Sequence, residues 1–177
     1  NKVKMYIISK GADGKLISQS TSIIKNNLVE YLIPYRMIND FVEINDGKIV
    51  NLQCEVDIFA DKIFNLNEVK IGVLNALKDF FDVDKAQLNQ HIYISQIVEV
   101  IRRVPGVINE CQIVFYNLEG GEYSNTIISQ ATFNREAINN SGIYRTQIEP
   151  INNAIYSTPL SIFEIRNPDV DIRVRVA

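Results

Sequence analysis

The feature that most constrains this chain is a long alternation of apolar and polar residues between Lys48 and Phe59. The two phases are Leu52, Cys54, Val56 and Ile58 against Gln53, Glu55 and Asp57. Successive side chains of a strand point to opposite faces of its sheet. The run therefore predicts a strand with one buried face and one face that is either wet or covered by a partner.

Two amphipathic segments follow this run. Asn65 with Glu68 resembles a capping box and opens a predicted helix, whose apolar stripe is Val69, Val73, Leu74, Leu77, Phe80 and Phe81. A glycine inside a helix costs about 1 kcal/mol relative to alanine. Gly72 therefore predicts a close packing neighbour at that point of the helix.

A second helix is predicted after a short extended piece, Ile92–Ile94. Ser95 is its expected cap, and Pro105-Gly106 is its expected end. A strand from Val107 to Tyr116 follows at once. The order strand, helix, helix, strand predicts an α+β layer with both helices on one face of a small sheet.

Turn residues predict two hairpins. Asn45-Asp46-Gly47 separates Phe41–Ile44 from the long alternating run, and such residues suit the positive φ angles of a tight turn. Asn167-Pro168-Asp169 predicts a turn between a strand at 161–166 and a strand at 170–176. The remaining expected elements are a strand at 3–9, a helix from Thr21 or Ser22 to Pro34, a strand at 123–133 and an irregular segment at 134–153.

These elements predict an α+β fold of small mixed or antiparallel sheets with a strand-helix-helix-strand unit and terminal β-hairpins. Residues 1–40 are expected to form an N-terminal strand and helix. The chain opens without Met and without a secretory leader, so it is expected to be a fragment whose residues 1–40 connect to an upstream part. Residues 41–118 form the core, and residues 119–177 form a β-rich segment packed on the same domain. A length of 177 residues fits one large or two small domains.

Composition narrows the function classes. Lys and Arg number 18 against 21 Asp and Glu, without the clustered basic surplus of a nucleic-acid-binding protein. No run approaches 18 apolar residues, so the sequence predicts no membrane-spanning helix.

No catalytic, cofactor-binding or metal-binding residues are predicted. His91 is the only histidine, and no nucleophile motif accompanies it. Cys54 and Cys111 are expected to be buried thiols. Asp79, Asp82 and Asp84 lack the glycine and terminal glutamate of a calcium loop, and residues 11–16 lack the spacing of a phosphate-binding loop. The chain is therefore predicted not to be an enzyme.

Apolar and aromatic residues exceed what one core face can take. Such a surplus is typical of contact with another chain, although a second layer within the same domain would also absorb it. The candidate interface residues are Phe80, Phe81, Tyr116, Tyr156, Phe163 and Val174.

Several short motifs together resemble a known family. They are Asn67-Glu68-Val69, Asp79-Phe80-Phe81, Leu88 before Ile92-Tyr93-Ile94-Ser95, and Val104-Pro105-Gly106-Val107, with flanks at 33–36, 46–52, 163–168 and 171–172. In order and spacing they resemble the carboxyl-terminal region of baseplate wedge proteins of contractile-tailed phages (the J-like assembly family), and the flanks resemble the wedge subunit of T-even-type phages.

The resemblance implies a homodimerising structural subunit of the virion tail baseplate, assembled in the host cytoplasm. It would be repeated around a six-fold axis, contact other wedge proteins near the tail tube and rearrange when the sheath contracts. The family offers no catalytic residues to carry over. No cofactor, nucleic acid, membrane or small-molecule substrate is expected as a partner of this chain. A second hypothesis also suits the strand-helix-helix-strand order: a regulatory domain that binds a small molecule at a sheet or dimer edge.

Overall fold

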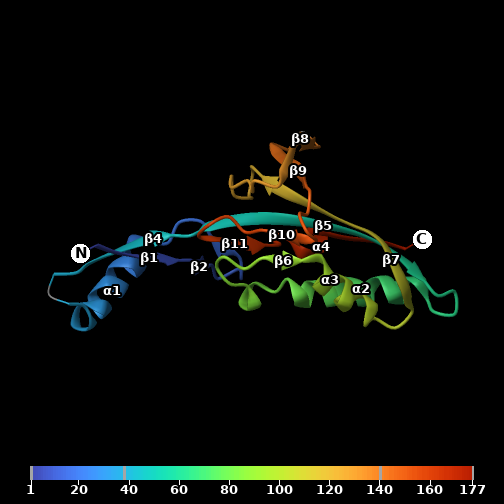
Figure 1. Cartoon of the computed structure of the whole chain (residues 1–177), viewed down its shortest axis with the longest axis horizontal. Coiled ribbons are helices and arrows are strands. Elements are labelled where there is room, and N and C mark those ends of the chain that lie inside the picture. Colours follow the sequence, from blue (N-terminus) through green and yellow to red (C-terminus); the bar gives the residue numbers. More distant parts are fainter. Residues whose placement is uncertain (1, 38, 140, 177) are drawn as a thin grey trace.

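The computed structural model describes residues 2–37, 39–139 and 141–176 and is an α+β fold, as predicted. Figure 1 shows an elongated molecule with a long sheet and two helices, α2 (Leu66–Phe80) and α3 (Ile94–Arg102), on one side of it. The strand-helix-helix-strand unit is confirmed. Its strands β5 (Lys48–Ala60) and β7 (Val107–Glu119) are antiparallel neighbours. None of the helices in the described ranges is long and apolar enough to cross a membrane.

The long alternating run forms β5, the strand on which the six-stranded sheet is built. The sheet order is β11 (Ser161–Glu164), β5, β7, β9 (Ile143–Ile148) and β8 (Ala131–Ile138), with β12 (Ile172–Val176) also paired to β5. The apolar phase is buried, as predicted: its members are Leu52, Cys54, Val56 and Ile58. They belong to one core cluster with Val69, Val73 and Leu77 of α2 and Ile97 and Ile101 of α3.

The helix predictions hold with small differences at the caps. The Asn65 side chain accepts a hydrogen bond from the Asn67 backbone N–H at 3.0 Å, so the side chain of Asn65 caps the N-terminus of α2. A Cβ on Gly72 would lie 2.9 Å from Cγ1 of Val104, which confirms the predicted close neighbour. Helix α3 begins one residue before Ser95, with Tyr93 at its cap position.

The hairpin predicted at Asn45-Asp46-Gly47 is wrong. Strand β4 (Phe41–Asp46) runs on into β5, and it pairs instead with β1 (Lys2–Ile7) in parallel. The Gly47 N–H donates to the Ile7 carbonyl, which continues that pairing past the expected turn. Gly47 is needed for space, because a Cβ there would lie 2.7 Å from Cδ1 of Ile8. The glycine of the Asn45-Asp46-Gly47 sequence is therefore explained by packing between distant segments and not by a positive φ at Gly47.

The C-terminal hairpin is also wrong. Strands β11 and β12 do not pair with each other; both pair in parallel with β5, one after the other along the same edge. Residues 165–171 leave the ladder between them and include one helical turn, α4 (Pro168–Asp171). The predicted turn residues therefore lie in the connection between β11 and β12, two strands that pair with the same edge of β5.

The segment before these strands differs most from the sequence prediction. Strand β8 begins at Ala131, so most of the described residues in the predicted strand range 123–133 do not form a strand. Residues 134–153, expected to be irregular, contain the rest of β8 and all of β9, which form an antiparallel hairpin. Strand β8 is the edge strand of the sheet and β9 lies between it and β7. Half of the residues in each of these two strands are polar, so the apolar alternation that marks a strand is weak there.

The N-terminal unit comprises β1, β4, α1 (Ser22–Leu32) and the short 3-10 helix η1 (Ile33–Tyr35). Helix α1 starts after Thr21 and ends before Pro34, as predicted. Between β1 and α1 lies a small hairpin of β2 (Ser9–Lys10) and β3 (Leu16–Ile17). The Asp13 carboxylate accepts from the Lys15 N–H at 3.1 Å in its turn, so the glycine-containing stretch is a hairpin turn.

Three short elements complete the fold. The two-residue strands β6 (Ile92–Tyr93) and β10 (Ala154–Ile155) pair antiparallel, which confirms the extended piece expected before the second helix. A 3-10 turn, η2 (Val83–Lys85), follows α2.

Cys54 is a free, buried thiol, as predicted, and burial raises its pKa. The side chain of Cys111 lies outside the described part of the structure.

Replacing Gly106 with alanine should destabilise the fold more than the same change at Gly142. Both glycines have positive φ (90° and 73°), where a Cβ costs about 1–2 kcal/mol. At Gly106 the Cβ would also lie 2.7 Å from Val69 and 2.8 Å from Phe64, whereas at Gly142 it meets nothing within 4 Å. Urea unfolding should give a loss of about 2–4 kcal/mol for Gly106→Ala and about 1–2 kcal/mol for Gly142→Ala. Equal losses would contradict this packing argument.

Candidate functional site

Exposed apolar side chains are concentrated in the N-terminal unit. We name the following set the N-terminal surface: Val3, Ile23, Ile24, Tyr31, Ile33, Tyr35, Met37 and Phe41. Met37 is 78% exposed and Tyr35 is 74% exposed. None of the described residues of α1 is buried. The helix therefore has the apolar spacing of a packed helix, yet this chain leaves most of that face uncovered.

The strand pairing in the same unit is unusual for an exposed position. Strands β1 and β4 form a two-stranded parallel sheet, and α1 is the helix that contacts it. Parallel strands occur almost only where both faces of the sheet are covered, and a two-stranded sheet alone is marginally stable. The unit therefore lacks part of the cover that its architecture normally has.

A second set of exposed apolar residues lies at the other end of the long sheet (Figure 1). We name the following set the distal surface: Phe59, Ile63, Phe64, Leu66, Ile71 and Ile108. They come from the end of β5, the loop after it, the first half of α2 and the start of β7. Because β5 and β7 pair antiparallel, Phe59 lies opposite Asn109, next to Ile108.

The loop that carries Ile63 is held by backbone and side-chain hydrogen bonds. The Asp61 N–H donates to the Gly106 carbonyl at 2.8 Å, and the Asp61 carboxylate accepts from the Ile63 N–H at 3.0 Å. The Asp61 carbonyl accepts from the Phe64 N–H at 3.0 Å. Ile63, 87% exposed, is thus presented on an ordered turn, and an ordered apolar side chain loses less entropy on binding than a flexible one.

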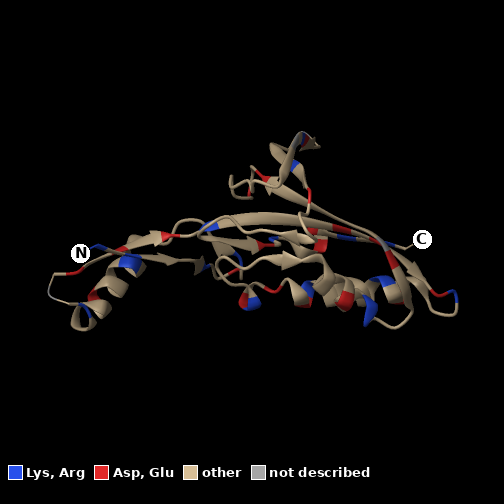
Figure 2. Cartoon of the chain, in the orientation of Figure 1, with Lys and Arg blue, Asp and Glu red and all other residues tan. Residues whose placement is uncertain are grey.

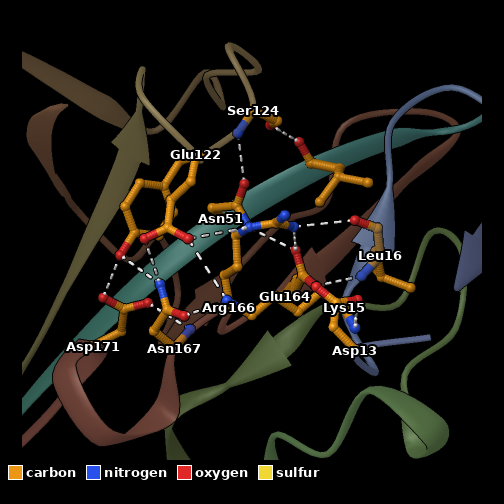
Figure 3. A network of polar contacts seen from close by, with 12 residues as sticks. Asp13, Lys15, Leu16, Asn51, Glu122, Ser124, Glu164, Arg166, Asn167 and Asp171 are labelled. Carbon is orange, nitrogen blue, oxygen red and sulfur yellow. Dashed lines mark hydrogen bonds and ion pairs between the residues drawn. The ribbon is translucent and has the colours of Figure 1, made fainter. Parts of the chain in front are cut away.

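A buried polar network fastens the N-terminal hairpin to the central sheet (Figure 3). Glu164 accepts from the Leu16 N–H at 2.7 Å and from the Asn51 side-chain amide at 2.8 Å. Arg166 donates to the Leu16 carbonyl at 3.1 Å and lies 3.6 Å from the Glu164 carboxylate. A buried carboxylate is tolerated only when charges and donors surround it. This network therefore positions β3, and with it the chain leading to α1, against β5 and β11.

The network continues along the connection between β11 and β12. Tyr123 donates its hydroxyl to Asp171 at 2.9 Å, and the Asn167 N–H donates to the other Asp171 oxygen at 2.9 Å. The Asn167 side chain donates to Glu122 at 2.9 Å. Burial raises the pKa of Asp171, and burial raises the pKa of Tyr123 to about 12. These contacts hold the loop after β7 against α4.

The opposite face of the sheet carries charge, as the alternation predicts. Glu55 on β5 pairs with three arginines: Arg145 at 3.3 Å, Arg173 at 3.3 Å and Arg175 at 3.0 Å. Figure 2 shows that charges of both signs are interspersed along the elements of the chain. This face is therefore a set of paired charges, unlike the two apolar surfaces.

A groove of about 760 Å³ runs between α2 and α3 and continues to the start of β6. Phe80, Phe81, Phe163, His91 and Arg103 contribute to its lining. The His91 Nδ1 accepts from the Ser157 N–H at 3.1 Å, and the ring packs edge-on against Tyr156 with centroids 5.1 Å apart. The ring of His91 therefore has structural contacts that account for its position.

The structure separates the six predicted interface residues. Phe163 and Val174 are buried in the core, so they offer little surface to a partner. Phe80 and Phe81 are partly buried, pack against the core and line the helical groove. Tyr116 is covered by the Arg145 guanidinium, 4.6 Å from its ring centroid, and Tyr156 is 37% exposed. Contact with another chain through these residues stays a prediction.

The exposed sets were missed for an identifiable reason. The apolar spacing of Ile23, Ile24 and Tyr31 marks a helix but not which side another layer covers. Tyr35, Met37 and Ile63 lie outside the amphipathic helices and strands and match no periodic pattern. The one available signal was a pair of adjacent apolar residues, Ile63-Phe64, directly before a helix cap.

The acidic residues considered for a metal site have other partners. Asp79 pairs with Lys85 and Asp84 pairs with Lys10, each at 2.5 Å. Asp82 caps η2 by accepting from the Asp84 N–H at 3.0 Å. Within residues 2–37, 39–139 and 141–176, no group of three or more His, Cys, Asp or Glu side chains is placed to hold a metal ion.

Comparison with known proteins adds no relationship. No protein-family model matches the sequence, and no curated protein matches it.

Replacing Glu164 with glutamine should weaken the attachment of the N-terminal hairpin. The amide keeps the shape, but its NH₂ group must face either the Leu16 N–H or the Asn51 amide, both of which are donors. An unsatisfied buried polar group costs about 1–3 kcal/mol. Urea unfolding should show a loss of this size, and hydrogen exchange should accelerate at the Leu16 amide. The matched change at exposed Glu149 should do neither, and unchanged exchange at Leu16 would contradict this role.

The stability of the fold should fall between pH 10 and pH 12 partly through Tyr123. The unfolded chain ionises this tyrosine near its ordinary pKa of 10.0, whereas burial raises its pKa in the folded chain to about 12. Over that range the folded state binds more protons, so its stability falls as pH rises. Urea midpoints at pH 9 and pH 11 should therefore differ less in Tyr123→Phe than in the unmodified chain. An equal difference between pH 9 and pH 11 in Tyr123→Phe and in the unmodified chain would refute the argument.

Proposed function

We propose that this chain is a structural subunit that works by binding other protein subunits, as part of a phage tail baseplate wedge. The observation that carries the assembly role is the presence of two exposed apolar surfaces at opposite ends of an elongated fold. Contiguous exposed apolar area on a soluble protein usually marks an interaction site. The motifs of the helical unit, which resemble baseplate wedge proteins, support the placement in a tail.

The N-terminal surface supplies the stronger argument for a partner. Its parallel strand pair and its helix α1 have the sequence of packed elements, but large apolar side chains of both stay exposed, and no residue of α1 is buried. Aromatic residues are enriched at interface cores, and Tyr31, Tyr35 and Phe41 are each at least 66% exposed. A partner that covered them would complete the layer that the parallel pair lacks.

A repeated subunit in a closed ring needs at least two contact regions, and this fold has two separate ones. Within the proposed role the chain contacts itself and other wedge proteins of the inner baseplate ring. The polar network around Glu164 has a place in this role, because it holds the N-terminal unit in a defined position relative to the core. Subunits that set a ring geometry require such a defined position.

A second candidate function is a regulatory domain that binds a small molecule. The groove between α2 and α3 supports it, because its volume of about 760 Å³ lies in the range of ligand pockets and its lining combines aromatic side chains with His91 and Arg103. This function requires a saturable ligand that raises the melting temperature. The assembly role accounts for more of the exposed apolar residues, since no residue of the N-terminal surface or of the distal surface lines the groove.

The baseplate role is tested by locating the chain in virus particles. Gold-conjugated antibody against the purified chain should label the tail end of the contractile-tailed particles produced by the genome that encodes it. Repeated copies around the tail axis are expected in averaged electron micrographs. Antibody absorbed beforehand with the purified chain is the control. Label on the capsid, or absence of the chain from purified particles by mass spectrometry, would refute the baseplate role.

A further inference from the structure

We infer that the outer edge of β12 binds an extended, acidic segment of a partner protein, which joins the sheet as one more strand. Strand β5 has β7 on one side and β11 and β12 on the other. Among the described residues, β12 pairs with β5 alone, so its second edge has no strand neighbour. Such an edge presents N–H and C=O groups that can pair with another chain. The inference goes beyond the proposed function, because this edge belongs to neither the N-terminal surface nor the distal surface.

The backbone of β12 is regular enough to take a neighbour. Its residues stay in one continuous register with β5 from Ile172 to Val176, whereas the pairing of β5 with β7 shifts register twice. The strand contains no proline. Proline and β-bulges are two common devices that stop an edge strand from pairing, and β12 has neither of them. It carries charge instead, and charge decides which chain can pair.

The outward side chains of β12 are basic. Arg173 and Arg175 both pair with Glu55, at 3.3 Å and 3.0 Å, and Asp57 lies 3.9 Å from Arg175. The Glu55 side chain is only 11% exposed, whereas those of Arg173 and Arg175 are 45% and 65% exposed. A guanidinium carries five N–H donors, so these contacts leave most of the donors unused. An approaching chain therefore meets cationic groups that can still bind a second carboxylate.

The helical side of the same edge carries a further basic residue. Helix α2 packs against β12, and its Lys78 pairs with Asp169, shortly before β12, at 2.5 Å. Residues four apart share one face of a helix, so Leu74 and Lys70 lie on the same side of α2 as Lys78. Leu74 is half-buried against the core, and Lys70 is exposed. A strand added to this edge therefore meets basic groups on both of its faces and an apolar side chain between them.

These charges select among the chains that could pair. Opposite charges directly across a strand pair are stabilising, and like charges are destabilising. A second copy of β12 would place arginine against arginine, which excludes pairing of this edge with itself. A nucleic acid would satisfy the guanidinium groups through its phosphates. Its phosphates, however, carry no N–H donors for the outward carbonyl groups of β12, so an acidic polypeptide matches both the charge and the backbone of the edge.

A synthetic peptide tests the inference on the unmodified chain. A labelled peptide of about seven residues that alternates glutamate with valine should bind saturably, as measured by fluorescence anisotropy. The same design with lysine in place of glutamate should show no saturable binding. Hydrogen exchange should slow at backbone amides within residues 172–176 when the acidic peptide is bound. These results together would place the acidic peptide at the β12 edge.

Backbone methylation separates strand pairing from attraction between charges. In one peptide the valine amides are N-methylated, and in another the glutamate amides are. Successive residues of a strand direct their N–H groups to opposite sides, so one methylated peptide should lose binding and the other should keep it. Attraction between charges alone would leave both bound equally, and that result would overturn the inference.

The basic side chains are tested by a pair of matched variants. Arg173→Gln with Arg175→Gln should weaken binding of the acidic peptide by at least about 5-fold, because two cross-strand charge pairs are lost. Arg102→Gln with Arg103→Gln, at the end of α3, is the control. It removes the same charge from side chains that are 57% and 73% exposed and should leave binding unchanged. Equal weakening in both variants would overturn the assignment to β12.

Two further outcomes would also overturn the inference. One is the absence of peptide binding at about 1 mM, the weakest affinity that a specific contact usually has. The other is binding of a thymidine oligonucleotide as tightly as the acidic peptide, which would show a general site for polyanions. None of these results bears on where the chain lies in virus particles, which the labelling experiment decides.

Discussion

The packing of the apolar face of β5 on α2 and α3 is the interaction on which the rest of this structure depends. Leu52, Cys54, Val56 and Ile58 are fully buried, and β5 has strand partners on both edges. The same chain direction continues upstream as β4, which carries the N-terminal unit. Burial of apolar surface is the dominant favourable term in folding, and β5 pairs with β7, β11 and β12 and packs on α2 and α3.

Polar contacts then transmit this geometry to elements that have little apolar packing of their own. The carboxylate of Glu164 joins β3, β5 and β11 through Leu16 and Asn51, in a site that excludes water. Directional hydrogen bonds of this kind define position more narrowly than apolar contact does. An N-terminal unit with few buried residues can therefore hold a defined orientation, which is a requirement for a subunit that joins others at a fixed angle.

Sequence patterns predicted the helical unit well because its signals are local. The stripes of α2 and α3 and the Asn65 cap all arise from residues within a few turns of one another. The predicted hairpins failed because a turn signal does not state which strands pair across it. Gly47 accommodates Ile8 and Leu88, and the residues around Pro168 let β12 return to the edge of β5.

The sequence by itself determined the α+β class, the two amphipathic helices and the buried phase of β5, because hydrophobic periodicity follows directly from the geometry of each element. Only the tertiary structure decided which strands are neighbours and which apolar residues stay exposed. Phe163 and Ile63 are both apolar, yet one is in the core and the other is 87% exposed. The difference lies in contacts between residues far apart in the chain, which no local pattern encodes.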